Sequence, residues 1–534
     1  MLTRRSLARE TRREAAELAF LRPHPRHINN GEESDYRNPP PGGLNFIANY
    51  SKGLPHNELG EVDPVAYRAM LKAVNSGEFN DFEQIPAGCT PDLTSLDCNV
   101  EMPRRLINPQ AGLAFDLEGP DAQAVTMPPA PRIDGPENSA EMAELYWMAL
   151  LRDVNFTDYG NDSGPNTTTE AADSLTDDFS AFSGPRDSMT GRVTPATLFR
   201  GFTPDDLVGP LLSQFLLRPV IFGTLRINQR QRTAQPGVDF MIDYNEWLCI
   251  QNGCRPANGD QFDPTRRFIR NARDLATYVH FDALYEAYLN ACLILLDLRV
   301  PFDQGNPYNT AVMQEGFGTF GGPHILSLVT EVATRALKAV WYQKWFVHRR
   351  LRPEAFGGLV HNQVTEAAEY PIDPEILDRG PGNILDRINQ QNRDRGSDTF
   401  LLPQAFPEGS PLHPAYGSGH STVAGACVTI LKAFFDESFV IPNPVVPDAD
   451  GRALVNAPAD TPPLTVRGEL NKVAANISIG RLMAGVHWRT DYSQAVRLGE
   501  EVAIGILEEQ ALTYNEPASF TLTRFDGTAI TIGA

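Results

Sequence analysis

The sequence predicts an all-α protein whose helices pack as bundles, with a long irregular N-terminal arm and a small C-terminal β-hairpin. From Ser139 onward, apolar residues recur at helical spacing over long segments, while the period-two alternation typical of strands is scarce. Before that point, residues 21 to about 140 are rich in Pro, Gly and Asn and hold few long periodic segments. These two observations carry the prediction of the fold class.

The predicted elements follow in order along the chain. The first 20 residues favour an amphipathic helix. We interpret residues 1–138 as an arm with short helices that makes inter-subunit contacts, and residues 139–534 as a helical-bundle catalytic domain. Helical patterns begin at Ser139, Asp205, Asp274, Gly322, Ser421 and Asp491. The Pro- and Asp-rich segment 441–470 predicts a surface excursion, and Asp526-Gly527 predicts the turn of the final hairpin.

The charge balance excludes some classes of partner. The net charge is −21 and the pI is near 4.9, so we expect neither nucleic acid nor an anionic membrane as the main partner. No apolar run approaches the roughly 20 residues that span a bilayer. The N-terminus lacks the apolar stretch of a secretory signal, so the cytoplasm is the location expected by default.

Four of the six cysteines form two close pairs in Gly-, Pro- and Asn-rich loops, Cys89 with Cys98 and Cys249 with Cys254. Each pair is near enough in sequence for a local disulfide, but the sequence leaves their redox state open. No Cys/His spacing is typical of a zinc site.

The first segment that indicates chemistry runs from Lys344 to Pro353. On a continuous helix Lys344 and Arg352 lie eight positions and so roughly 80° apart, on one broad face. Pro353 disfavours helix at Arg352, which places that guanidinium at the helix end. The structural alternative is a basic helix end that complements the helix dipole.

The second segment reads His-Pro-Ala-Tyr-Gly-Ser-Gly-His-Ser-Thr at 413–422 and precedes an apolar helix. Gly417 and Gly419 permit a tight loop that directs backbone N–H groups and a helix N-terminus toward one point, which suits an anion. Ser418 adds a hydroxyl, and His420 adds a donor that titrates near neutral pH. The structural alternative is an ordinary Gly/Ser helix start.

The third segment is 480–491. Arg481 and His487 are six positions apart and face different sides of a continuous helix. Gly485 can end the helix between them and return His487 toward the site. Asp491, four residues on, begins the next helix and can hold His487 in one tautomer. The structural alternative is a buried histidine.

Taken together, the three segments predict a pocket for a tetrahedral or trigonal-bipyramidal oxyanion. They supply three cations, a hydroxyl, a glycine amide and two histidines: Lys344, Arg352, Arg481, Ser418, Gly419, His420 and His487. The cations neutralise the oxyanion's oxygens. One histidine can bond the central atom, and the other can act on the opposite apical oxygen.

This arrangement resembles the vanadium-dependent haloperoxidases, a superfamily shared with acid phosphatases of the type-2 phosphatidic acid phosphatase kind. The family pattern matches at all seven positions, here Lys344…Arg352-Pro353, Ser418-Gly419-His420 and Arg481…His487. These motifs span residues 344–491, about a quarter of the chain. The resemblance implies a core of two four-helix bundles. One departure is Gly417, where the family tends to have Pro; it adds freedom and should remove no ligand.

The resemblance implies a vanadate cofactor and a role for each pocket residue. His487 would bond vanadium axially, while the side chains of Lys344, Arg352, Ser418 and Arg481 and the amide of Gly419 would hold the equatorial oxygens. His420 would bond the apical hydroxide and act as acid and base, and Lys344 would polarise hydrogen peroxide. The vanadium would act as a Lewis acid and stay fully oxidised. The products would be hypobromite-like species that halogenate organic compounds.

The residues around the motifs refine the resemblance. A histidine stands at the position of His413 in algal-type bromoperoxidases and an aromatic residue in fungal chloroperoxidases, so we expect bromide as the substrate. Gln343 and Trp341, beside Lys344, are candidates for the halide pocket. Asp282 is the candidate carboxylate partner of the cluster's last arginine. The flanks KWFVHRRLRPEAFGG and AGVHWRTD resemble the algal and cyanobacterial branch, which implies a large homo-oligomer.

Two other functions are alternatives to the bromoperoxidase, one enzymatic and one non-enzymatic. An acid phosphatase would take His487 as nucleophile and His420 as general acid. A non-enzymatic oxyanion-binding or shell-forming protein would need no two-histidine axis across the anion. The acidic chain, the long arm and His413 favour the bromoperoxidase.

Overall fold

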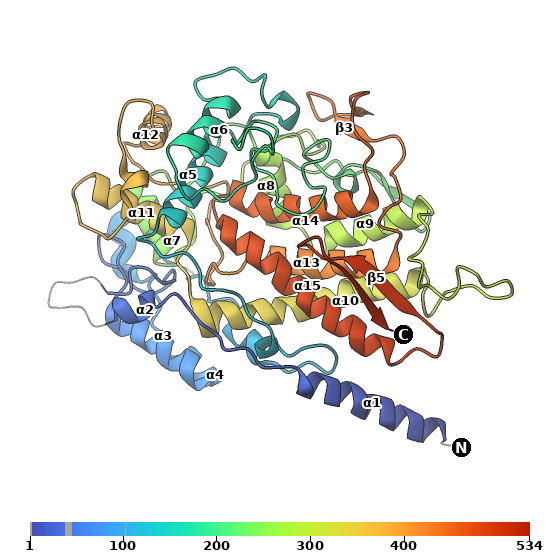
Figure 1. The fold of residues 1–534 in the computed structure, drawn as a ribbon. Helices are drawn as coiled ribbons and strands as arrows, with labels where there is room; N and C mark the ends of the chain where they lie inside the picture. The colour runs from blue at the N-terminus through green and yellow to red at the C-terminus, as the bar shows by residue number, and fades with distance from the viewer. Residues whose placement is uncertain (1–2, 38–44, 102, 534) are drawn as a thin grey trace.

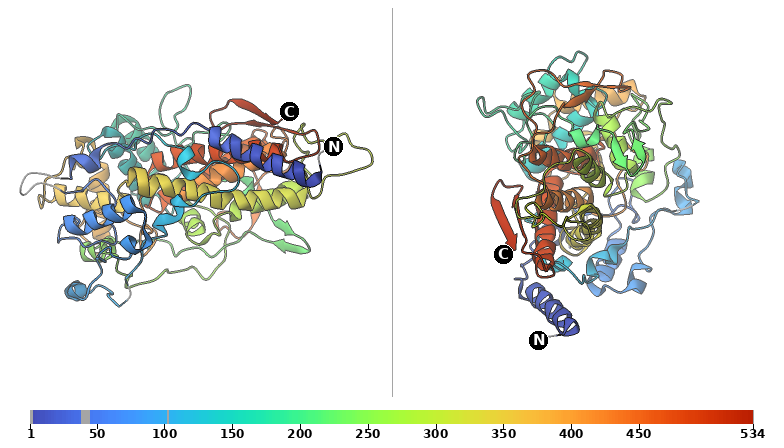
Figure 2. Two further views of the ribbon diagram at one scale, coloured as in Figure 1. Left: turned by 90° about the horizontal axis from the view of Figure 1, so that it is seen from below. Right: turned by 90° about the vertical axis from the view of Figure 1, so that its right-hand side faces the viewer.

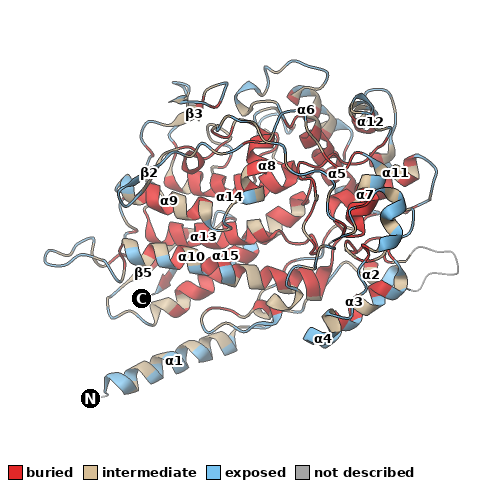
Figure 3. Cartoon of the chain, turned by 180° about the vertical axis from the view of Figure 1, so that it is seen from behind, coloured by how far each residue is buried: buried red, intermediate tan, exposed pale blue. Residues whose placement is uncertain are grey.

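The computed structural model describes residues 3–37, 45–101 and 103–533 and is mostly helical, so the predicted fold class is confirmed. At its centre is a four-helix bundle of α10 (Gly322–Tyr342), α13 (Gly419–Phe434), α14 (Val466–Met483) and α15 (Arg489–Ala511). Helix α13 packs against the other three and is buried along almost its whole length (Figures 1 and 3). Its apolar surface therefore forms the middle of the core.

Helices α13 and α15 cross in close contact because glycines lie at the crossing. A Cβ atom on Gly425 would lie 2.0 Å from the carbonyl oxygen of Val496, and one on Gly499 would lie 1.9 Å from that of Thr422. No side chain fits at either position, so the two backbones touch. This contact fixes the beginnings of α13 and α15 relative to each other, and both beginnings carry candidate site residues.

The other helices and strands surround the bundle. The helices are α1 (Arg4–Leu21), α2 (Glu32–Asp35), α3 (Pro64–Ser76), α4 (Phe79–Phe82), α5 (Pro136–Leu150), α6 (Thr168–Asp177), α7 (Tyr244–Gln251), α8 (Ala272–Phe281), α9 (Glu286–Asp297), α11 (Pro353–Val364) and α12 (Ile384–Asp394). The strands pair as antiparallel hairpins: β1 (Val220–Phe222) with β2 (Leu225–Ile227), β3 (Val445–Pro447) with β4 (Leu454–Asn456), and β5 (Ser519–Thr523) with β6 (Ala529–Gly533). The last pair confirms the C-terminal hairpin.

The part of the chain before α5 lies along the outside of the bundle. Its apolar residues Phe46, Tyr67 and Met70 are buried in one cluster with Trp341 and Trp345, at the C-terminal end of α10.

Helix α1 has no buried residue and extends away from the body of the protein (Figures 1 and 2). Across the described ranges, no single helix is long and apolar enough to cross a membrane, and one bent pair, α8 with α9, passes by length and composition only.

The four paired cysteines join segments that are distant in sequence, which corrects the local pairing considered above. Cys89 bonds Cys254 and Cys98 bonds Cys249, across 165 and 151 residues. The physical reason is an antiparallel approach of the arm to the end of α7, marked by a β-bridge between Asn99 and Arg255. Neighbouring cysteines therefore face the opposite segment instead of each other.

Candidate oxyanion-binding site

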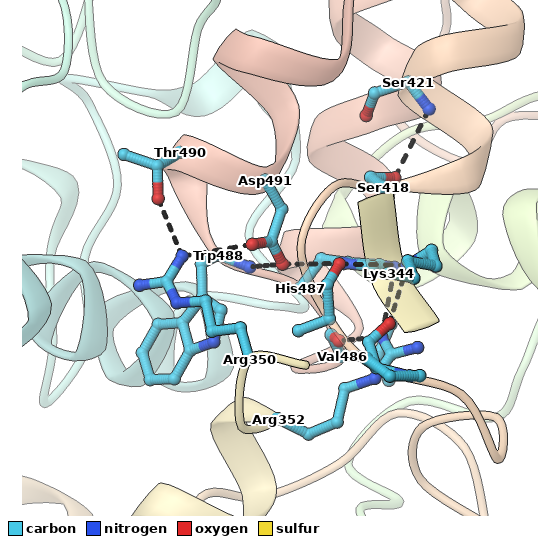
Figure 4. Close-up of polar contacts among 12 residues, drawn as sticks. Lys344, Arg350, Arg352, Ser418, Ser421, Val486, His487, Trp488, Thr490 and Asp491 are labelled. Atoms are coloured by element: carbon cyan, nitrogen blue, oxygen red, sulfur yellow. Dashed lines mark hydrogen bonds and ion pairs between the residues drawn. The ribbon is translucent and has the colours of Figure 1, made fainter. Parts of the chain in front are cut away.

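Lys344 follows the end of α10 instead of continuing it. A π-helical turn, Gln343–His348, replaces the α-helix, and Arg349 then adopts a left-handed conformation with φ of 45°. The single helical face predicted for Lys344 and Arg352 is therefore wrong. Lys344 is fully buried, and its Nζ donates to the carbonyl oxygens of Pro414 at 2.7 Å and Ala415 at 3.0 Å. These contacts bring it to the second predicted segment (Figure 4).

Arg352 is the residue that joins the three segments. Pro353 does interrupt the helical conformation at Arg352, but Arg352 precedes α11 instead of ending the helix before it. Its guanidinium donates to the carbonyl oxygen of His413 at 2.8 and 2.9 Å and to that of Val486 at 2.6 Å. It also lies 2.9 Å from Nδ1 of His413 and 3.0 Å from Nε2 of His487.

The Ser-Gly-His segment begins α13, as its pattern predicted. Ser418 caps the helix, and its Oγ accepts from the backbone N–H of Ser421 at 3.3 Å. A Cβ on Gly419 would lie 3.2 Å from the ring of Trp341, so glycine lets the loop sit close to that ring. The side chain of His420 is 18% exposed, and its Nε2 lies 3.0 Å from Oδ1 of Asp282, which follows α8.

The third segment reverses direction at Gly485, as predicted. Helix α14 ends at Met483, and Gly485 has a φ of +85°. This turn brings His487 back so that its Nε2 faces Arg352, while its Nδ1 lies 2.8 Å from Oδ2 of Asp491 in the first turn of α15. Asp491 therefore occupies the position beside His487 that the sequence predicted.

Arg481, the remaining cation, lies in the last turn of α14. Its Nη1 donates to the carbonyl oxygen of Val279 at 2.7 Å, and its guanidinium stacks over the ring of Phe406 at 5.3 Å. Its buried Nε has no hydrogen-bond partner among the described residues. Asp282 is near enough to raise the pKa of Arg481, but its hydrogen bond goes to His420, so its partner differs from the one predicted.

The pocket is strongly electropositive. Among the residues described, no carboxylate forms an ion pair with Lys344, Arg352 or Arg481, and their hydrogen bonds go to carbonyl oxygens and histidine nitrogens. Burial lowers the pKa of Arg352 and of Arg481 to about 10, and burial together with Arg352 lowers the pKa of Lys344 well below its usual value. Burial and the neighbouring cations likewise hold the pKa values of His413 and His487 well below normal, so both are neutral.

Trp341 and Gln343, the two candidates for the halide pocket beside Lys344, make contacts with different parts of the protein. The ring of Trp341 lies 4.6 Å from that of His413 and 5.7 Å from Nζ of Lys344, beside the pocket. Gln343 instead turns away, and its side-chain amide donates to the carbonyl oxygen of Val125 in the arm at 3.0 Å. The place of Gln343 in a halide pocket therefore stays a prediction.

Sequence reasoning missed Arg350, a buried arginine that contacts the carboxylate oxygen of Asp491 that His487 does not contact. One of its nitrogens lies 3.1 Å from Oδ1 of Asp491 (Figure 4). Another lies 2.6 Å from Oε2 of Glu141 in α5. The adjacent Arg349 binds Glu33 of the arm instead. The only signal in the sequence was the run of arginines, which does not distinguish these destinations.

These features define a mostly helical protein with a buried pocket for an oxyanion. A family model described as the VCPO second helical-bundle domain matches residues 389–515. The vanadium-dependent bromoperoxidase of Corallina officinalis is 44% identical over 98% of this chain and 97% of its own, and that of Ascophyllum nodosum is 37% identical over 94% and 87%. A solved structure, the homohexameric second vanadate-dependent bromoperoxidase of Ascophyllum nodosum, matches with a TM-score of 0.90 and 31% identity, over 100% of this chain and 91% of its own. The chain belongs to the vanadium-dependent bromoperoxidase family.

Proposed function

We propose that this protein binds vanadate in the pocket and oxidises bromide with hydrogen peroxide to hypobromite-like species that halogenate organic compounds. The observation that carries the proposal is a set of three buried cations whose hydrogen bonds go to neutral acceptors. Such a set leaves positive charge that a multiply charged oxyanion would neutralise. The family membership gives the identity of that oxyanion.

The donor set fits vanadate. Lys344, Arg352 and Arg481 would hold its oxygens together with Ser418 and the amide of Gly419. His487 would bond vanadium through Nε2, because Asp491 already occupies Nδ1. When bound, vanadium(V) supplies Lewis acidity that activates peroxide toward halide.

The protein's own residues relay from solvent the proton that the reaction consumes. Bromide, hydrogen peroxide and one proton give hypobromous acid and one water. His420 is placed to move this proton, because its side chain is partly exposed and its Nε2 is held by Asp282. Burial of Lys344 keeps its ammonium away from water, so its charge is directed at the bound oxygens.

The choice of halide and the assembly are finer parts of the proposal. His413, packed against Trp341 and Arg352, supports bromide over chloride. We also propose that the chain forms a homo-oligomer in which the arm contacts another copy. Helix α1 supports this, because Phe20 is 82% and Leu21 is 73% exposed on a helix without buried residues.

One assay tests the function. Purified protein, freed of anions and then given vanadate, should brominate a phenol-red-type dye when bromide and peroxide are added. His487→Ala should abolish the reaction, whereas His361→Ala, a histidine whose Nδ1 accepts from Phe400 in another part of the fold, should leave it intact. Cleavage of a phosphate ester without bromination would favour the phosphatase. Turnover of chloride comparable with bromide would contradict the halide preference.

A further inference from the structure

Arg350 lies behind the pocket, and its side chain is 4% exposed. Nη1 donates to Oγ1 of Thr490 at 2.7 Å and lies 3.1 Å from Oδ1 of Asp491. Nη2 donates to Oε2 of Glu141 at 2.6 Å and to Oδ1 of Asn138 at 3.0 Å. The guanidinium therefore joins α5 to the first turn of α15.

Asp491 connects Arg350 to the pocket. Its Oδ2 accepts from Nδ1 of His487 at 2.8 Å and from the backbone N–H of Trp488 at 3.0 Å, while its Oδ1 accepts from Arg350 (Figure 4). A carboxylate held at both oxygens has one orientation. Because it only accepts, it selects the His487 tautomer with the proton on Nδ1 and leaves Nε2 facing the pocket.

The backbone of Arg350 reaches the pocket by a second route. Its carbonyl oxygen accepts from the N–H of Ala415 at 3.1 Å. The carbonyl oxygen of Ala415 in turn accepts from Nζ of Lys344 at 3.0 Å. Arg350 thus supports the loop that places Lys344 as well as the carboxylate that places His487.

We propose that Arg350 is a positioning residue of the oxyanion pocket, which holds His487 in its binding orientation through Asp491. The inference rests on the proposed function, since it concerns vanadate binding in the same pocket. The planar fork is required because different nitrogens bind Asp491 and Glu141 at the same time. A lysine ammonium offers a single nitrogen and cannot hold both carboxylates in this geometry.

The fold offers a matched control in Arg489. This buried arginine also joins α15 to α5, with its Nε 2.7 Å from Oε2 of Glu144. It also donates to the carbonyl oxygen of Arg200, and within the described ranges it makes no hydrogen bond to Asp491 or His487. Its loss should therefore cost stability without loosening the pocket.

The test compares wild type, Arg350→Lys, Arg350→Gln and Arg489→Gln as apoproteins, with orthovanadate alone as the probe. Calorimetric titration gives the vanadate affinity, ring ¹⁵N NMR gives the tautomer of His487, and thermal unfolding gives the stability. We expect both Arg350 variants to lose roughly 10- to 100-fold in affinity and to populate the other tautomer. Arg489→Gln should stay within about threefold of wild type at a similar loss of stability.

The remaining outcomes of this experiment overturn either the inference about Arg350 or the proposed function. Wild-type affinity and tautomer in the Arg350 variants overturn the inference, and so does an equal loss of affinity in Arg489→Gln. If Arg350→Gln does not fold, Arg350→Lys, which keeps the charge, carries the test. Absence of vanadate binding by the wild type would instead overturn the proposed function.

Discussion

The nested disulfides make a prediction that depends on their connectivity. Each bond alone closes a loop of 165 or 151 residues, which in the chain-entropy treatment stabilises the folded state by about 5 kcal/mol. The two separations differ by 14 residues, and that is the loop the second bond closes once the first has formed. Closing such a short loop contributes only about 3 kcal/mol.

Removing one bond should therefore cost less than half of what removing both costs. Replacing Cys89 and Cys254 by alanine, or Cys98 and Cys249, should lower the free energy of unfolding by about 3 kcal/mol, because the remaining bond still closes the long loop. Replacing all four should lower it by about 8 kcal/mol, which exceeds the sum of the two pairs by about 2 kcal/mol.

Urea unfolding followed by tryptophan fluorescence measures these free energies, and peptide mapping without reduction identifies the bonds. Local pairing would close two short, independent loops, so the two losses would simply add. Additive losses, or a peptide that links Cys89 to Cys98, would refute the reasoning. The four-alanine variant should also show whether the arm stays docked once it is no longer bonded to α7.

Three further predictions concern the site, the arm and the assembly. Asp282→Ala should lower kcat for bromination by roughly 10- to 100-fold with a smaller change in vanadate affinity, because His420 loses its acceptor; equal losses in both would contradict this. Burial raises the pKa of Glu32 to about 7, so the folded protein binds more protons than the unfolded chain between about pH 4.5 and 7, and stability falls as pH rises through that window. Glu32→Gln should remove this dependence and stabilise the protein at pH 8 by up to about 3 kcal/mol, measured by thermal unfolding at pH 5 and pH 8. Deleting residues 1–21 should reduce the particle mass in light scattering without lowering the melting temperature; an unchanged mass would exclude α1 from the interface.

The beginnings and ends of the site helices could be predicted because local chemistry sets them. Ser418 caps α13 and Gly485 ends the turn after α14, and both effects depend on one or two residues. The joint order of the three segments then indicated a single pocket. The structure brings Lys344, Arg352 and His487 together as that order implied.

Other features could not be predicted because their causes are distant in sequence. The π-helical turn at Gln343–His348 and the left-handed Arg349 leave no periodic signal, so the sequence suggested a continuous helix there. Arg350 gains its role from Glu141 in α5, which lies 209 residues earlier in the chain. The cysteine pairing depends on how the arm runs past α7, and neither segment carries that information alone.

The unneutralised cations of the pocket have a consequence for handling the protein. Any anion that enters the pocket binds only the folded chain, so its concentration sets part of the measured stability. At one hundred times its dissociation constant, such an anion adds about 2.7 kcal/mol to the free energy of unfolding. Phosphate has the same tetrahedral outline as vanadate and would compete for the pocket. A protein purified in phosphate buffer would then have a higher melting temperature and a lower rate of bromination than one kept in a buffer without oxyanions.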